Sequence, residues 1–165
     1  MNRRSFVLLP IASMFAWVLL ARPAEADLSK KVIAAFKGKI LVTSGAIGMG
    51  PNDKDTIAHF KKAALTRVAG EQNGNDVQEW TFNYTAFLKN AAGVKSLKLE
   101  FYRGDTYAAD QTLTEVDPKL TVVEGDVTIN EDDGLTKGKT YTLKLVGTVK
   151  GKDVVLASAP NIMFD

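Results

Sequence analysis

The chain has 165 residues, a formal net charge of +2, 45% hydrophobic residues and no cysteine. Without cysteine there are no disulfides and no lipoprotein-type lipid anchor, so an exported domain must be held together by its apolar core. The chain has one histidine and no cysteine, which argues against a zinc or copper centre.

The first 26 residues have the layout of a secretory signal peptide. Arg3 and Arg4 precede the apolar run Phe6–Ala21, and Ala24 and Ala26 supply small residues for cleavage. We expect cleavage after Ala26, so that 1–26 is removed. The alternative is an uncleaved anchor helix, which is disfavoured because the run has only 16 residues and contains a proline.

The leader also resembles the twin-arginine export signal, since Arg3 and Arg4 are followed by one residue and then by Phe6 and Val7. This resemblance implies a bacterial exported protein, periplasmic or secreted, with general secretion as the alternative route. The remaining chain, 27–165, would hold 18 basic and 18 acidic residues in one domain. Its neutrality argues against nucleic-acid binding, and no later segment has the apolar length of a membrane span.

Helical periodicity occurs twice near the mature N-terminus. The spacing predicts a first helix within 27–39, capped at Asp27 or Ser29 and stopped by a glycine. It predicts a second helix within 52–70, capped by an aspartate and ending at a glycine. Its β-branched residues leave a strand at Thr66–Val68 as the alternative. A strand is predicted between the two helices, over 39–47.

From Val77 onward, apolar residues recur at every second position, which is typical of half-buried strands. The predicted strands lie within 79–89, 91–105, 120–134, 139–149 and 153–164. Hairpins are predicted at Ala91–Val94 and Lys150–Asp153. A change of parity in the third segment predicts a bulge or a break near Glu124–Gly125. About seven such strands require two sheets that meet face to face.

Leu135 and Tyr141 stand six residues apart at the entry to the strand 139–149. This spacing resembles the tyrosine corner of immunoglobulin-like and fibronectin type III sandwiches. The resemblance covers about the last 85 residues, and Trp80 is similar to their early-strand core tryptophan. It implies a buried Tyr141 ring whose hydroxyl bonds to the upstream backbone. The cysteine pair of antibody domains is absent, which implies a looser relative.

The predicted fold is therefore mainly β. It is an antiparallel immunoglobulin-like sandwich of about seven strands over 27–165, with one or two short helices near the mature N-terminus. Burying about ten large side chains between the sheets, at roughly 1.5–3 kcal/mol each, outweighs what turn propensities supply.

Few residues suggest catalytic chemistry. His59 is the single histidine and no Gly-x-Ser-x-Gly motif exists, so a Ser-His-Asp triad is unsupported. The glycines at 45, 48 and 50 fit no nucleotide fingerprint and indicate a surface loop. One acidic segment carries oxygen ligands that suit calcium, and a solvated turn is the alternative. Its residues are Asn130, Glu131, Asp132 and Asp133.

These observations favour a non-enzymatic exported binding, adhesion or accessory module, without a cofactor unless the acidic turn holds calcium. A protein or glycan partner would meet the loops 45–55, 103–110 and 130–137, or an exposed strand edge. Two alternatives stay open. One is a carboxylate-based hydrolase acting on polysaccharide, which needs two carboxylates in a concave site. The other is a structural component that assembles through strand edges.

Overall fold

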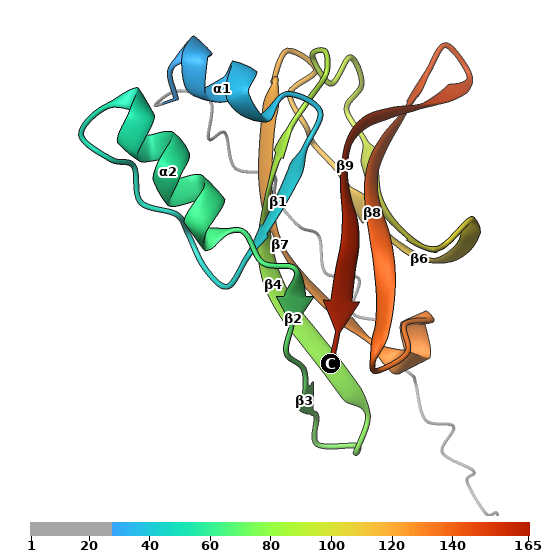
Figure 1. Cartoon of the computed structure of the whole chain (residues 1–165). Coiled ribbons are helices and arrows are strands. Elements are labelled where there is room, and N and C mark those ends of the chain that lie inside the picture. Colours follow the sequence, from blue (N-terminus) through green and yellow to red (C-terminus); the bar gives the residue numbers. More distant parts are fainter. Residues whose placement is uncertain (1–27) are drawn as a thin grey trace, which may run out of the picture.

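The computed structural model describes residues 28–165, so the signal peptide predicted for 1–26 lies outside the described residues. The described chain is mainly β (Figure 1). Neither of its two helices has the length and apolar character needed to cross a bilayer. The helices are α1 (Lys30–Phe36) and α2 (Asp53–Ala63). The strands are β1 (Ile40–Thr43), β2 (Arg67–Val68), β3 (Glu71–Gln72), β4 (Gln78–Phe87), β5 (Leu97–Arg103), β6 (Thr106–Leu113), β7 (Val122–Asn130), β8 (Lys139–Val149) and β9 (Lys152–Phe164).

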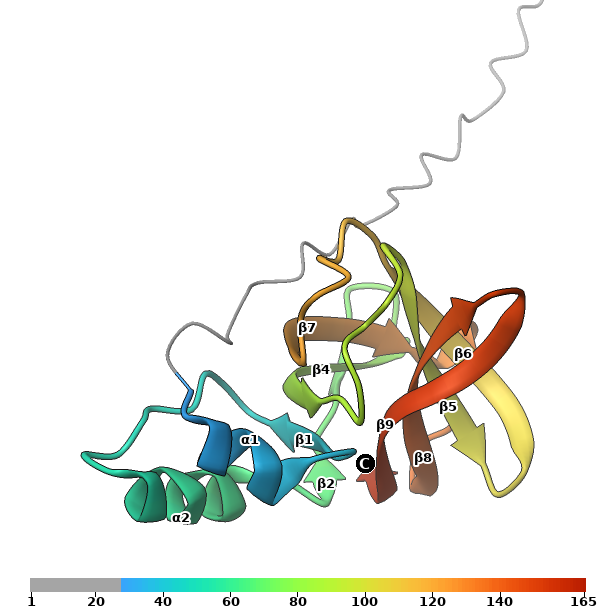
Figure 2. The same ribbon diagram turned by 90° about the horizontal axis from the view of Figure 1, so that it is seen from above.

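The strands form two sheets. In the first, β4 pairs antiparallel with β7 along one edge and with β1 and β3 along the other. The second has the order β2-β9-β8-β5-β6 and is antiparallel except for the parallel pair β2–β9. It curls strongly (Figure 2). The antiparallel pairing predicted from the sequence is confirmed, whereas the curl and the parallel pair were not predicted.

The inward faces of the two sheets share one core, as the period-two pattern predicts. Phe164, at the end of β9, lies at its centre with four aromatic neighbours in tilted or edge-on contact, at centroid distances of 5.7–6.1 Å. Edge-on packing suits aromatic rings because their positive edges meet negative faces. The four neighbours are Trp80, Phe82, Phe101 and Tyr141.

Tyr141 forms the bend that its spacing from Leu135 predicts. Both side chains are 2% exposed. The backbone N–H of Thr136 donates to the Tyr141 hydroxyl at 2.8 Å, which fixes the chain before it enters β8. The buried ring and the upstream hydrogen bond are therefore confirmed.

A second, smaller core lies between the helices and the outward face of the first sheet (Figures 1 and 2). Phe87 of β4 packs against Phe36 of α1 at 5.1 Å and against Phe60 of α2 at 6.0 Å, measured between ring centroids. The helices thus cover one end of this sheet, which is buried on both sides.

This covering layer explains the change of parity in β7. Val122 belongs to the core beneath the helices and Val123 to the core between the sheets, so both are buried although they point in opposite directions. β7 pairs with β4 from Val122 to Asn130 without a register shift. The bulge or break predicted near Glu124–Gly125 was therefore wrong.

The two predicted hairpins have different outcomes. The segment Ala91–Val94 joins strands of different sheets, so a hairpin there was wrong. Ala92 is fully buried at this crossing, and its N–H donates to the Leu120 carbonyl at 2.9 Å. The hairpin between β8 and β9 is confirmed. Its turn residues, Lys150 and Gly151, have φ of +52° and +75°, which matches the twist of the flanking strands.

The helices begin at side-chain caps, as expected, but the second is shorter than predicted. The Ser29 hydroxyl accepts from Val32 N–H before α1. Asn52, rather than an aspartate, caps α2, which ends at Ala63 instead of near position 70. The chain then enters β2, so the alternative strand at Thr66–Val68 describes this segment better.

Candidate functional site

The outward face of the five-stranded sheet carries a cluster of tyrosines and charged side chains, which we call the β5 face. Its members on β5 have the parity opposite to the buried leucines, so they face away from the core. Strand register places Glu100 opposite Asp110 of β6 and Lys144 of β8. The β5 face consists of Lys98, Glu100, Tyr102, Tyr107, Asp110 and Lys144.

Hydrogen bonds and a cation–π contact hold the β5 face together. The Tyr102 hydroxyl donates to Glu100 at 2.9 Å, and the Tyr107 hydroxyl donates to Asp110. The two rings lie edge to face at 5.9 Å. The Lys144 ammonium lies 3.8 Å from the centre of the Tyr102 ring. These contacts fix the side chains while leaving Tyr107 50% exposed.

The same contacts alter the acidity of both tyrosines. The hydrogen bond to Asp110 raises the pKa of Tyr107 from 10.0 to about 12, because ionisation would remove the donated proton. The hydrogen bond to Glu100 raises the pKa of Tyr102 in the same way. Both phenols therefore remain donors at neutral pH.

A cavity of about 430 Å³ continues from the β5 face toward the β8–β9 hairpin. Lys98 and Glu100 belong to both, and the Lys98 ammonium lies 3.7 Å from an Asp110 carboxylate oxygen. The lining mixes both charge signs with hydroxyl groups. The remaining lining residues are Val94, Lys95, Ser96, Val146, Thr148 and Asp153. We call the cavity and the β5 face together the β5 groove.

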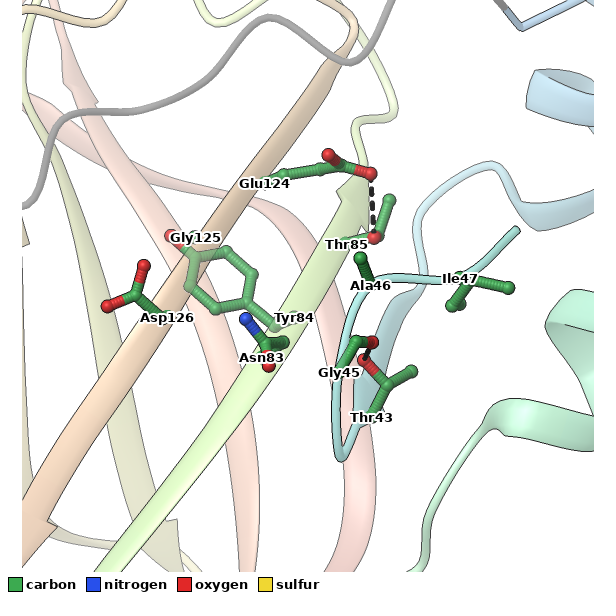
Figure 3. A pocket seen from close by; sticks show the side chains of 10 residues that line it. All are labelled: Thr43, Gly45, Ala46, Ile47, Asn83, Tyr84, Thr85, Glu124, Gly125 and Asp126. Atoms are coloured by element: carbon green, nitrogen blue, oxygen red, sulfur yellow. Dashed lines mark hydrogen bonds between the residues drawn. The ribbon is translucent and has the colours of Figure 1, made fainter. Parts of the chain in front are cut away.

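A second depression, the acidic pocket, lies on the other sheet beside the loop after β1 (Figure 3). It has a volume of about 130 Å³. The β4–β7 register sets Glu124 opposite Thr85 and Asp126 opposite Asn83. The Thr85 hydroxyl donates to Glu124 at 3.1 Å. The lining residues are Thr43, Gly45, Ala46, Ile47, Asn83, Tyr84, Thr85, Glu124, Gly125 and Asp126.

Tyr84 lies behind this pocket, against Gly125 of the neighbouring strand (Figure 3). A Cβ atom at Gly125 would come within 2.8 Å of the Tyr84 hydroxyl, so only glycine leaves room for the ring. The hydroxyl is buried and has no hydrogen-bond partner within residues 28–165. Burial, followed by the charge of Asp126, raises its pKa, so the phenol stays neutral.

The acidic segment predicted to suit calcium forms a capped 3₁₀ turn, Glu131–Asp133. Asn130 Oδ1 accepts from Asp133 N–H at 3.1 Å, and Asp133 Oδ2 accepts from Asn130 N–H at 3.0 Å. Glu131 and Asp132 are exposed. Across residues 28–165, no three side chains of the His, Cys, Asp or Glu types gather closely enough to hold a metal ion. Calcium binding by Asn130, Glu131, Asp132 and Asp133 stays a prediction.

The remaining sequence candidates are His59 and the three loops expected to meet a ligand. His59 is exposed on α2, with Nδ1 3.4 Å from the Gly48 carbonyl oxygen. Two of the three loops expected to meet a ligand, 103–110 and 130–137, lie in contact. A Cβ atom placed on Gly134 would come within 2.4 Å of the Ala108 carbonyl oxygen. The loop 45–55 lies on the helix side of the first sheet (Figure 1).

The loops 103–110 and 45–55, expected from the sequence to meet a ligand, supply Tyr107 and Asp110 to the β5 face and 45–47 to the acidic pocket. The strand residues of both sites were not identified from the sequence. The outward parity of β5 was visible, but it also describes any solvated strand face. The sequence feature that could have indicated the groove is the pair Tyr102 and Tyr107, which flank the turn between β5 and β6. The acidic pocket had no such signal, because Glu124 and Asp126 gain their neighbours only through the β4–β7 register.

No protein-family model, curated protein or solved structure matches this chain. The functional argument therefore depends on the fold, the β5 groove and the acidic pocket.

Proposed function

We propose that the chain is an exported, non-enzymatic binding module of immunoglobulin-like sandwich architecture, which binds glycan in the β5 groove. The tyrosine corner at Tyr141 supports the architecture, and the signal-like leader supports a periplasmic or secreted location. The observation that carries the function is the 50% exposed Tyr107, whose hydroxyl bonds to Asp110, the ion-pair partner of a lysine that lines the adjoining cavity.

The chemistry of the groove suits a sugar better than an apolar ligand. Sugars offer C–H faces that stack on aromatic rings, and hydroxyls that both donate and accept hydrogen bonds. Tyr107 presents such a ring, Glu100 and Asp110 accept, and Lys98 donates. From Lys98 to Tyr102 the groove follows β5 for about 13 Å, which suits an extended chain.

Binding is tested by titrating the purified protein with soluble oligosaccharides that carry neutral, acidic or amino sugars. We expect one class to bind, and we expect Tyr107→Ala to weaken its affinity roughly two- to twelvefold, since an aromatic stacking contact contributes about 0.5–1.5 kcal/mol. Tyr107→Phe keeps the ring and serves as the matched control, with affinity near that of the parent. If no class binds, or if Tyr107→Ala binds as well as the parent, the glycan assignment fails.

The acidic pocket supports a second candidate function, a carboxylate-based hydrolase acting on polysaccharide. The pocket is concave, and Glu124 and Asp126 lie two residues apart on one face of β7, roughly 6–7 Å between Cα atoms. The test is release of reducing ends from polysaccharides by the parent, Glu124→Gln and Asp126→Asn. Release that falls at least about a hundredfold in both variants would favour hydrolysis, and no release by the parent would reject it.

A further inference from the structure

β7 is hydrogen-bonded to another strand along only one of its edges within residues 28–165. That edge pairs with β4. On the other side, the Thr128 carbonyl accepts the Gln111 side-chain amide at 2.6 Å. In an antiparallel strand the N–H and C=O of one residue point the same way, and alternate residues share a direction. The main-chain groups of Glu124 and Asp126 therefore face the same side as those of Thr128.

Two buried polar atoms near this strand have no partner within residues 28–165. They are Gln111 Oε1 and the Tyr84 hydroxyl. Gln111 is the residue whose amide reaches β7, and the Tyr84 ring lies against Gly125 in the middle of β7. Buried polar groups are nearly always hydrogen-bonded, so two orphans along one strand indicate a partner that the chain itself does not supply.

The charge of this strand indicates what kind of partner fits. Glu124 and Asp126 have the same parity on β7 and lie opposite Thr85 and Asn83 in the β4–β7 register. Figure 3 shows Glu124 extending toward Thr85 and Asp126 on the other side of the β7 ribbon. Among residues 28–165, neither carboxylate forms an ion pair. A second copy pairing through β7 would bring acidic side chains near one another, which is destabilising. A basic segment would place lysine or arginine beside them at the same two-residue spacing.

We propose that the free edge of β7 accepts an extended segment of an exported partner, with basic residues at alternating positions. The added strand pairs with the main-chain groups of Glu124 and Asp126 and with the Thr128 N–H, while the Gln111 amide keeps its bond to the Thr128 carbonyl. This mode of recognition adds a strand to a sheet edge, so main-chain bonds provide affinity and side chains provide selectivity. It uses neither the β5 groove nor its ligand.

The probe is a capped eight-residue peptide that alternates lysine and threonine, titrated into the purified protein by fluorescence anisotropy. Two comparison peptides carry glutamate in place of lysine, or methyl groups on alternate main-chain nitrogens. We expect the lysine peptide to bind at least tenfold more tightly than either. We also expect slower amide hydrogen exchange at Asp126 and Thr128 in its presence. Equal binding of the methylated peptide would reduce the effect to charge attraction and overturn strand addition.

Variants separate the edge from other surfaces. Asp126→Asn should weaken the lysine peptide about two- to fivefold, whereas Asp132→Asn, which removes the same charge at the exposed turn, should not. Tyr107→Ala should also leave peptide binding unchanged, so a failed glycan assignment does not affect this result. Equal loss in both aspartate variants, absence of peptide binding, or a dimer in sedimentation that protects the β7 amides would each overturn the proposal.

Tyr84→Phe tests the orphan hydroxyl. Because the variant removes a buried group without a partner, we expect stability to be unchanged or higher, and peptide affinity to fall about threefold. A clear loss of stability would show that the hydroxyl already has a partner in the free protein.

Discussion

The outward faces of the two sheets have the same sequence pattern but different surroundings. On the first sheet, α1 and α2 cover one end, and Phe87 and Val122 are buried there as completely as residues of the central core. On the second sheet, the outward side chains of β5 stay in contact with solvent and form the β5 face. A strand's alternation therefore shows which residues can face the core, and the layer above it decides whether the other face is also buried.

The largest expected effect is a loss of stability when a side chain beneath the helices is removed. Phe87→Ala removes a fully buried ring that packs on Phe36 and Phe60, so we expect a loss of about 3–5 kcal/mol in the free energy of unfolding. Tyr107→Ala, on the open face, should cost less than about 1 kcal/mol. Chemical denaturation of both variants checks the difference. Similar losses would mean that the helices do not seal the first sheet.

A smaller effect compares two tyrosines that differ in burial. Tyr141→Phe removes the acceptor of the Thr136 N–H at a 2%-exposed position, so we expect a loss of about 1–3 kcal/mol. Tyr107→Phe removes a donor at an exposed position, where the loss should stay within about 0.5 kcal/mol. Urea unfolding midpoints of the two variants provide the measurement. An unchanged midpoint for Tyr141→Phe would show that the hydrogen bond from Thr136 does not stabilise the fold.

The same comparison shows what the sequence could predict. The alternation in β4, β5 and β8, together with the Leu135–Tyr141 spacing, was enough to predict the inward core and the corner, because both depend on local order. The parity change at Val122 and Val123 predicts an irregular strand, because the pattern alone does not show that a helical layer buries the second face. Likewise, Ala91–Val94 resembled a hairpin, although its strands belong to different sheets.

The candidate sites were harder to predict, since they depend on register between distant strands. Asn83 meets Asp126 and Glu100 meets Lys144 only after the strands pair. The acidic segment 130–133 was noticeable because its residues are consecutive. In the structure, two of its side chains cap their own turn. Residues that are consecutive in the sequence therefore predicted a site at a turn. The groove and the pocket, in contrast, combine residues that are far apart in the sequence.

The open face also makes a prediction about pH. The pKa of Tyr107, raised from 10.0 to about 12 by its bond to Asp110, gives a stabilising contribution that is present below pH 10 and lost between pH 10 and 12. The effect is small because the group is exposed. Absorbance titration at the phenolate band, subtracting Tyr107→Phe from the parent, should show a transition near pH 12. Asp110→Asn should move it toward 10, and a parent transition already at 10 would contradict the hydrogen bond.

The smallest expected effect concerns the acidic turn, where the comparison is between side chains that cap the backbone and side chains that remain exposed. Asn130 and Asp133 already accept backbone N–H groups of the turn, and Glu131 accepts the Lys137 N–H at 3.4 Å, so calcium would compete with these bonds. We therefore expect millimolar calcium to change the melting temperature by less than about 1 °C relative to chelator, because only binding to the folded state raises it. A rise of several degrees that disappears in Asp132→Asn would instead establish the turn as a calcium site, and it would show that capping and metal binding can share the same four residues.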